Sequence, residues 1–223
     1  MARTKKAPKN RKRAKDNTLI VFLLDRSGSM LSIKEDVEGG FQAFIAEQRK
    51  APGTCHVSLA QFDTEYESVY TRVPVHDSPP LNLQPPGCTA LLDSMGRVIR
   101  DTEAAINGLP ASAKPDNVIL AVMTDGLENA SREWTRDGIK KLVKEKSADG
   151  WEVLYMGANQ DAIEIGSSVG IAPSRSITYT TNNADKVFAA MSSSVVEYRA
   201  AASQGLDDTV LAFTDQQRDE VVG

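Results

Sequence analysis

The sequence contains little cysteine and histidine and no long apolar run. Only two residues of each of these types occur among 223. No Cys-x-x-Cys is present, and no cysteine–histidine group has zinc-site spacing, so no structural zinc is expected. No apolar run reaches 18 residues, which argues against a membrane span, and residues 19–24 are too short for a secretory signal core. We therefore expect a cytoplasmic protein in which Cys55 and Cys88 are buried free thiols, with a disulfide as the alternative.

The motifs of nucleotide-driven and serine-nucleophile enzymes are absent as well. Neither Gly-x-x-x-x-Gly-Lys nor Gly-x-Gly-x-x-Gly occurs. Residues 166–170 match Gly-x-Ser-x-Gly, but His56 and His76 both precede them, whereas a triad histidine follows its serine in that fold. We treat this match as chance and expect no catalytic residue.

Charge is distributed unevenly along the chain. The formal net charge is −4, but residues 1–15 hold eight of the 26 basic residues and no acidic one, so the remainder, with 18 basic and 30 acidic residues, carries −12. Residues 1–16 are therefore predicted to be a flexible basic arm. Such an arm can bind the phosphates of nucleic acid or an anionic surface, or serve only as a solubilising tail. The candidate nucleic-acid contacts are Arg3, Lys5, Lys6, Lys9, Arg11, Lys12, Arg13 and Lys15.

Apolar strands alternate with amphipathic helices along residues 17–203, the predicted domain. Continuous apolar runs are typical of strands buried on both faces, and an alternating run is typical of an edge strand. The pattern predicts an α/β fold: a doubly wound, mostly parallel central sheet with one antiparallel edge strand and helices on both faces. Strands are expected at 18–24, 55–62, 67–75 (the edge), 117–124, 151–156 and 176–180, and helices at 32–50, 89–107, 134–148 and 183–203.

The last residues, 204–223, form a predicted C-terminal tail. They are polar and show little periodicity. Val210, Leu211 and Phe213 are the apolar residues expected to pack back on the domain.

Two aspartates and three hydroxyls are predicted to meet at one rim of the sheet. Asp25-Arg-Ser27-Gly-Ser29 follows the first buried strand. Asp125 follows another buried strand, and Thr89 begins a helix. Ligands bind outside the carboxyl ends of the strands in such sheets. Oxygen-only donors suit Mg²⁺ or Mn²⁺. Hydroxyl ligands do not neutralise the ion, which can then take an acidic side chain from a partner.

These residues resemble the metal-ion-dependent adhesion site of the von Willebrand factor A (vWA) family, in which Asp-x-Ser-x-Ser, Gly-x-Thr and Thr-Asp-Gly follow in this order. The resemblance covers roughly residues 17–200. It implies a Rossmann-like fold in which Asp25, Ser27, Ser29 and Thr89 bind the metal directly or through water, and Asp125 through water. It also implies a protein partner with an exposed Asp or Glu, with a separately encoded MoxR-type AAA+ ATPase as one candidate.

A narrower resemblance concerns residues 154–160, Leu-Tyr-Met-Gly-Ala-Asn-Gln. This run is similar to small stand-alone vWA proteins of bacteria and their phages. It implies a bacterial cytoplasm or, for a phage protein, the host cytoplasm or the virion. Within the run, Asn159 is interpreted as a strand-to-helix cap, with a place on the ligand surface as the alternative.

Several residues of the site also have a purely structural interpretation. Ser27, Ser29 and Thr89 could be helix caps, and Asp125 could belong to a turn. Arg26 is expected to point away from the site, although it could also weaken metal binding or attract an anion. The convergence of the three segments favours the metal.

Three functions follow from these patterns. The first is a divalent-cation-dependent protein-binding module of the adhesion type. The alternative is a nucleic-acid- or particle-associated structural protein anchored by the basic arm. A hydrolase using the same ion is disfavoured, because the carboxylates are few and no general base is placed beside them. We therefore expect a protein that is not an enzyme.

Overall fold

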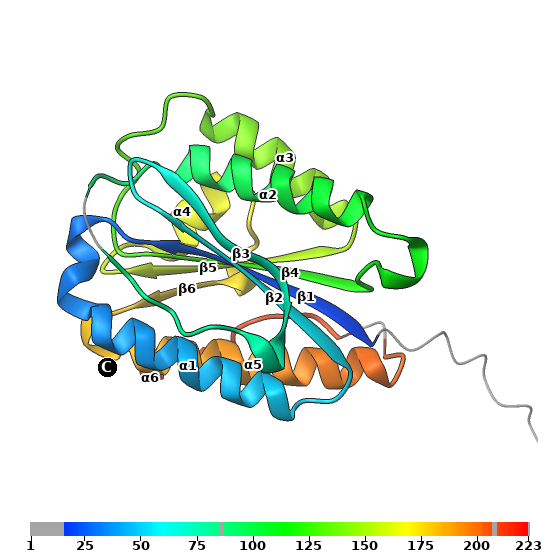
Figure 1. Cartoon of the computed structure of the whole chain (residues 1–223). Helices are drawn as coiled ribbons and strands as arrows, with labels where there is room; N and C mark the ends of the chain where they lie inside the picture. Colours follow the sequence, from blue (N-terminus) through cyan, green and yellow to red (C-terminus); the bar gives the residue numbers. More distant parts are fainter. Residues whose placement is uncertain (1–15, 85–86, 207–208, 223) are drawn as a thin grey trace, which may run out of the picture.

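One six-stranded sheet forms the centre of the molecule (Figure 1). The computed structural model describes residues 16–84, 87–206 and 209–222. Its strands are β1 (Asn17–Asp25), β2 (Thr54–Phe62), β3 (Tyr66–Pro74), β4 (Asn117–Thr124), β5 (Trp151–Ala158) and β6 (Ser176–Tyr179). Their order is β3-β2-β1-β4-β5-β6, and only the β2–β3 pair is antiparallel. The predicted α/β sheet with an antiparallel edge strand is confirmed.

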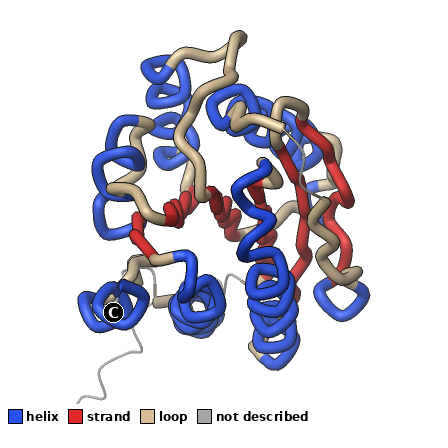
Figure 2. Tube along the Cα trace, turned by 90° about the vertical axis from the view of Figure 1, so that its left-hand side faces the viewer, coloured by secondary structure: helices blue, strands red, loops and turns tan. Residues whose placement is uncertain are grey.

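Helices cover both faces of this sheet in two layers (Figures 1 and 2). One layer holds α1 (Lys34–Lys50), α5 (Ala184–Ser203) and α6 (Asp215–Val222); the other holds α2 (Leu91–Asn107), α3 (Arg136–Ala148) and α4 (Ala162–Ser168). A short 3-10 helix, η1 (Gly28–Ile33), connects β1 to α1. In the part of the chain that is described, no helix is both long and apolar enough to cross a membrane.

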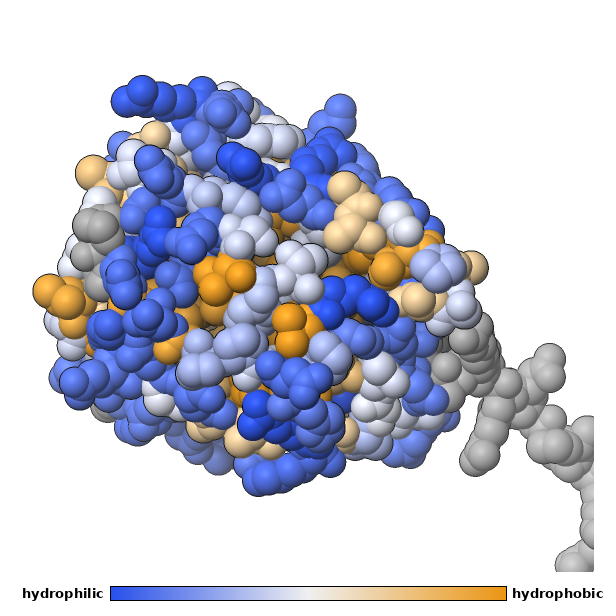
Figure 3. Space-filling model, in the orientation of Figure 1, coloured by the Kyte–Doolittle hydropathy of each residue, from blue (hydrophilic) through white to orange (hydrophobic). Residues whose placement is uncertain are grey.

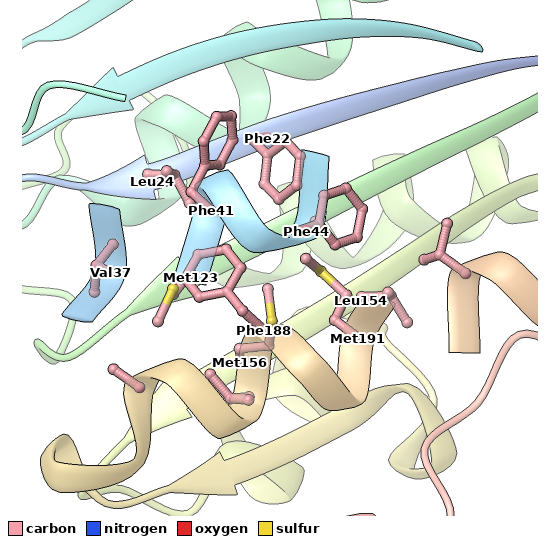
Figure 4. Close-up of a cluster of buried hydrophobic side chains, with 14 of the residues drawn as sticks. Phe22, Leu24, Val37, Phe41, Phe44, Met123, Leu154, Met156, Phe188 and Met191 are labelled. Atoms are coloured by element: carbon pink, nitrogen blue, oxygen red, sulfur yellow. The ribbon is translucent and has the colours of Figure 1, made fainter. Parts of the chain in front are cut away.

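Strand β1 is buried on both faces, which explains its continuous apolar sequence. Phe22 faces α1, where its ring centroid lies 4.9 Å from that of Phe41 and 5.1 Å from that of Phe44 (Figure 4). Val21 and Leu23 face the opposite layer, in the apolar cluster that includes α2 and α3. Packing from both sides fixes the strand, and so fixes the position of Asp25 at its end.

The two adjacent glycines of α1 have different surroundings. A Cβ on Gly40 would lie 2.5 Å from the ring of Phe188 in α5, so glycine lets the two helices approach closely. Gly39 has no atom within 4 Å of a Cβ position. The close contact between α1 and α5 therefore explains the glycine at position 40, but not the one at position 39.

The structure differs from the sequence-based expectations at several points. Helix α2 begins two residues after Thr89, and helix α6 was not predicted. Leu211 and Phe213 are buried as expected, but Val210 is exposed. Cys88 is an exposed free thiol, so the expectation that both cysteines are buried holds only for Cys55.

Candidate metal centre

Asp25 joins the ends of the two central strands. It is the last residue of β1 and its side chain is fully buried. Its Oδ1 accepts a hydrogen bond from the backbone N–H of Ser27 at 2.7 Å, and its Oδ2 accepts one from Thr124 Oγ1 at 2.6 Å. Thr124 ends β4, the parallel neighbour of β1. The carboxylate is thus held at the rim by both strands.

The two serines extend this hydrogen-bonded chain to the second aspartate. Ser27 Oγ and Ser29 Oγ lie 3.1 Å apart, and Ser29 Oγ donates to Asp125 Oδ1 at 2.7 Å. Asp125 directly follows β4. Four of the five predicted metal residues therefore form a continuous set of contacts across two segments separated by about a hundred residues.

Thr89, the fifth residue, faces the same small space. A Cβ added to Gly126 would lie 2.6 Å from Thr89 Oγ1 and 3.6 Å from Asp25 Oδ2. The hydroxyl of Thr89 and the carboxylate of Asp25 therefore both border the space beside Gly126. A side chain at position 126 would enter that space.

Side-chain capping does not account for Ser27 or Thr89. Ser27 occupies the N-cap position of η1, but its side chain makes no capping hydrogen bond. The N-cap of α2 is Ala90 rather than Thr89. Their hydroxyls are not used by helix ends and remain available to the site.

Burial disfavours the charged forms of both aspartates. It raises the pKa of Asp25 to about 6; the hydrogen bonds from Thr124 and Ser27 oppose this rise, and the negative charge of Asp125 adds to it. Burial also raises the pKa of Asp125, against its hydrogen bond from Ser29. Two such carboxylates beside neutral hydroxyls fit a cation, whose positive charge would offset the desolvation of both.

The donor set has few charged groups. Among the described residues, no three His, Cys, Asp or Glu side chains gather in a group that could hold a metal. The candidate centre instead combines two carboxylates with three hydroxyl oxygens. Oxygen donors of this kind fit Mg²⁺ or Mn²⁺, which retain several water ligands in proteins.

Arg26 forms ion pairs with carboxylates other than the two of the candidate centre. Its Nε lies 3.2 Å from Asp63 Oδ2, and its Nη1 pairs with Glu67. The guanidinium is therefore paired toward the β2–β3 end of the rim, and its charge is matched there by two acidic side chains.

The loop after Asp125 contains residues that support the site and that the sequence analysis did not identify. Asn129 Oδ1 accepts from the backbone N–H of Thr89 at 3.0 Å, and the backbone N–H of Asn129 donates to the Thr89 carbonyl at 3.1 Å. Glu128 Oε2 accepts from the N–H of Leu92 at 2.9 Å. These hydrogen bonds attach the loop that follows Asp125 to the start of α2. They therefore hold Thr89 in place relative to Asp125.

Asp93 completes the attachment from the helix side. Its carboxylate accepts hydrogen bonds from three consecutive backbone N–H groups, those of Arg132, Glu133 and Trp134, at 2.7 to 3.0 Å. The sequence pattern that could have pointed to these contacts is the concentration of Asn, Glu and Ser in residues 128–131. The distant amides that these side chains bind cannot be read from the sequence.

Two further predictions concern Asn159 and the basic residues of positions 1–15. Helix α4 is capped by Asp161, which accepts from the N–H of Glu164 at 2.9 Å, so the capping role predicted for Asn159 is wrong. Asn159 instead adopts a left-handed conformation with φ of 51°, and its N–H donates to Tyr179 O. The basic residues of positions 1–15 lie outside the described residues.

Comparison with known proteins gives structural matches alone. No family model and no curated protein matches the chain. Proximal thread matrix protein 1 from the mussel byssus, solved with a zinc-occupied MIDAS motif, is 16% identical with a TM-score of 0.57, over 86% of this chain and 49% of that one. The pilus adhesin SpaC of Lactobacillus rhamnosus GG is 15% identical with a TM-score of 0.60, over 83% and 31%.

A third match covers a single domain. The vWF domain of the type V pili tip protein Mfa5 of Porphyromonas gingivalis is 10% identical with a TM-score of 0.59, over 81% of this chain and 95% of that one. The chain thus spans about half of the mussel protein and a third of SpaC, but nearly all of the Mfa5 domain. At these identities the matches concern the fold.

Proposed function

We propose that this chain, a vWA-fold domain, is a divalent-cation-dependent protein-binding module. The observation that carries the proposal is the convergence of Asp25, Ser27, Ser29, Thr89 and Asp125 on one space at the carboxyl ends of β1 and β4. The ion would be Mg²⁺ or Mn²⁺, and the partner would supply an exposed Asp or Glu.

Each residue has a distinct part in this proposal. Asp25 supplies the buried negative charge, and Thr124 and the Ser27 amide hold it in place. Ser27, Ser29 and Thr89 supply neutral oxygens. Asp125 is positioned by Ser29 and acts through water. A cation bound by these groups supplies positive charge and a coordination position for a partner carboxylate.

The structural neighbours support this assignment at a coarse level. The mussel protein has zinc in its MIDAS motif, and SpaC is a pilus adhesin. The sequence resemblance to the vWA family adds a separately encoded MoxR-type AAA+ ATPase as a candidate partner. We further propose that the domain binds rather than catalyses.

Metal-dependent capture tests the proposal. Immobilised domain is exposed to lysate of the source cells in Mg²⁺, and the retained proteins are released with EDTA. The expected result is a protein set that the wild type retains and Asp25→Asn does not. Asp77→Asn serves as the matched control, because Asp77 is exposed and follows β3 at the opposite rim. Retention that is equal for all three proteins and unaffected by EDTA would contradict the proposal.

A second candidate function rests on the charge segregation of the sequence. Eight basic residues precede a body of formal charge −12. Under this proposal residues 1–15 bind nucleic acid through phosphate contacts. Binding should then fall steeply with salt and be lost when residues 1–15 are deleted. Unchanged binding after the deletion would exclude the arm as the anchor.

A further inference from the structure

We propose that the partner presents a single carboxylate flanked by apolar side chains, which contact Leu31 and Leu127. This inference rests on the proposed function and specifies the chemistry of its partner. Leu31 is 65% exposed and lies two residues after Ser29. Leu127 is 63% exposed and lies two residues after Asp125. Two strongly exposed leucines thus accompany the two segments of the metal centre.

Hydrogen bonds bring these segments together. Ser29 Oγ donates to Asp125 Oδ1 at 2.7 Å, so the leucines follow residues that are in contact. In Figure 3 apolar surface reaches the edge of the molecule at the end where η1 lies in Figure 1. Isolated exposed leucines are common; in this proposal their place beside the two segments that Ser29 and Asp125 hold in contact makes them a contact surface for the partner.

The local structure keeps both leucines outward. In η1 the side chains of Met30 and Ile33 are buried, and the roughly three-residue period of a 3-10 helix turns Leu31 to the outside. Leu127 is followed by Glu128, whose carboxylate binds the N–H groups of Leu92, Ala130 and Ser131. Leu127 therefore projects from a loop that is tied to the protein, which reduces the entropy lost on binding.

The positive charge of Arg26, beside the first metal segment, is already matched by acidic side chains. Arg26, the cationic side chain within the Asp-x-Ser-x-Ser segment, is paired with Asp63 and Glu67. It does not offer a second anchor for negative charge. In this proposal the cation holds the carboxylate, and the residues beside that carboxylate meet Leu31 and Leu127.

Matched peptides test this inference. The probes are short capped peptides with Leu-Asp-Leu, Ser-Asp-Ser or Leu-Asn-Leu at the centre, titrated by NMR in Mg²⁺ and in EDTA. We expect Leu-Asp-Leu to bind about tenfold more tightly than Ser-Asp-Ser in Mg²⁺, because burial of two leucine contacts is added. Leu-Asn-Leu should bind weakly and without dependence on Mg²⁺.

Variants of the protein locate the contacts. The Leu31→Ser/Leu127→Ser double variant should remove the preference for leucine flanks and keep the Mg²⁺-induced rise in Tm, since both side chains are exposed. Leu206→Ser is the matched control: Leu206 is 55% exposed and follows α5 at the opposite end of the sheet, so this variant should keep the preference.

The outcomes separate this inference from the function on which it rests. Equal Mg²⁺-dependent binding of Leu-Asp-Leu and Ser-Asp-Ser would overturn the inference and leave the cation-dependent function standing. Tight binding of Leu-Asn-Leu would overturn it by showing apolar adhesion without the carboxylate. Absence of Mg²⁺-dependent binding by either aspartate peptide would overturn the proposed function together with the inference.

Discussion

Substitution of Gly126 by alanine tests the geometry of the candidate centre without changing any proposed ligand. The added Cβ would lie 2.6 Å from Thr89 Oγ1. Comfortable heavy-atom contacts begin at about 3.5 Å, so the hydroxyl must move by roughly 0.9 Å. Gly126 has no positive φ, so alanine brings no backbone strain and the effect comes from space alone.

The displacement is large on the scale of metal coordination. Mg²⁺ requires near-octahedral ligands at about 2.1 Å, so we expect its affinity to fall about tenfold or more. For a wild-type Kd of ~1 mM, the stabilisation by ~10 mM Mg²⁺ would fall from roughly 1.4 to roughly 0.4 kcal/mol. Overpacking should also lower the metal-free stability by about 2 kcal/mol. Thermal melts with Mg²⁺ and with EDTA measure both changes.

Gly39→Ala provides the matched control. Gly39 is an exposed residue within α1, and a Cβ there meets nothing within 4 Å. Alanine should stabilise the helix by about 0.5–1 kcal/mol and leave the Mg²⁺ response unchanged. A full Mg²⁺ response in Gly126→Ala would refute the reasoning, because Thr89 could not then be a ligand in the space beside Gly126.

Three further predictions concern the supports of the site and of the fold. Asn129→Ala should weaken Mg²⁺ binding severalfold in calorimetric titration and Asn129→Asp should restore it, because aspartate keeps the acceptor for the Thr89 amide. Arg199→Met should cost about 3 kcal/mol in urea unfolding, since it leaves the carbonyls of Gln48, in the last turn of α1, and of Pro52, just after α1, without the guanidinium; a loss below about 1 kcal/mol would show that the buried guanidinium is dispensable. The hydrogen bond from Lys146 lowers the pKa of Glu103 below its usual value of 4.5, so the ion pair stabilises the fold at neutral pH and this stabilisation is lost as the pH falls below that value. The Tm deficit of Glu103→Gln should therefore shrink on acidification, and a deficit independent of pH would exclude the ion pair as its cause.

The sequence predicted the fold, and the convergence of the five candidate residues, because short-range patterns encode both. The apolar runs at 18–24 and 117–124 are continuous because β1 and β4 are buried on both faces. Parallel strands end at one rim, so Asp25 and Asp125 had to lie near one another. The five residues of the centre do surround one space; their binding of a metal remains a prediction.

Other features depend on contacts that the sequence does not display. Helix α6 is polar and buries little besides Val221, so its periodicity is weak. Asn129 and Glu128 act on backbone amides about 40 residues away in the chain. The exposure of Cys88 depends on how the loop before α2 lies against the rim, which proximity to Thr89 in sequence does not determine.

The most direct test of the cation site is a thermal melt of wild type, Asp25→Asn and Asp77→Asn in EDTA and in ~10 mM Mg²⁺ or Mn²⁺. A site of about millimolar affinity should add roughly 1.4 kcal/mol, a Tm rise of about 3–6 °C. We predict this rise in wild type and Asp77→Asn, and its absence in Asp25→Asn. An equal rise in all three proteins, or none in wild type with either ion, would contradict a cation site at Asp25.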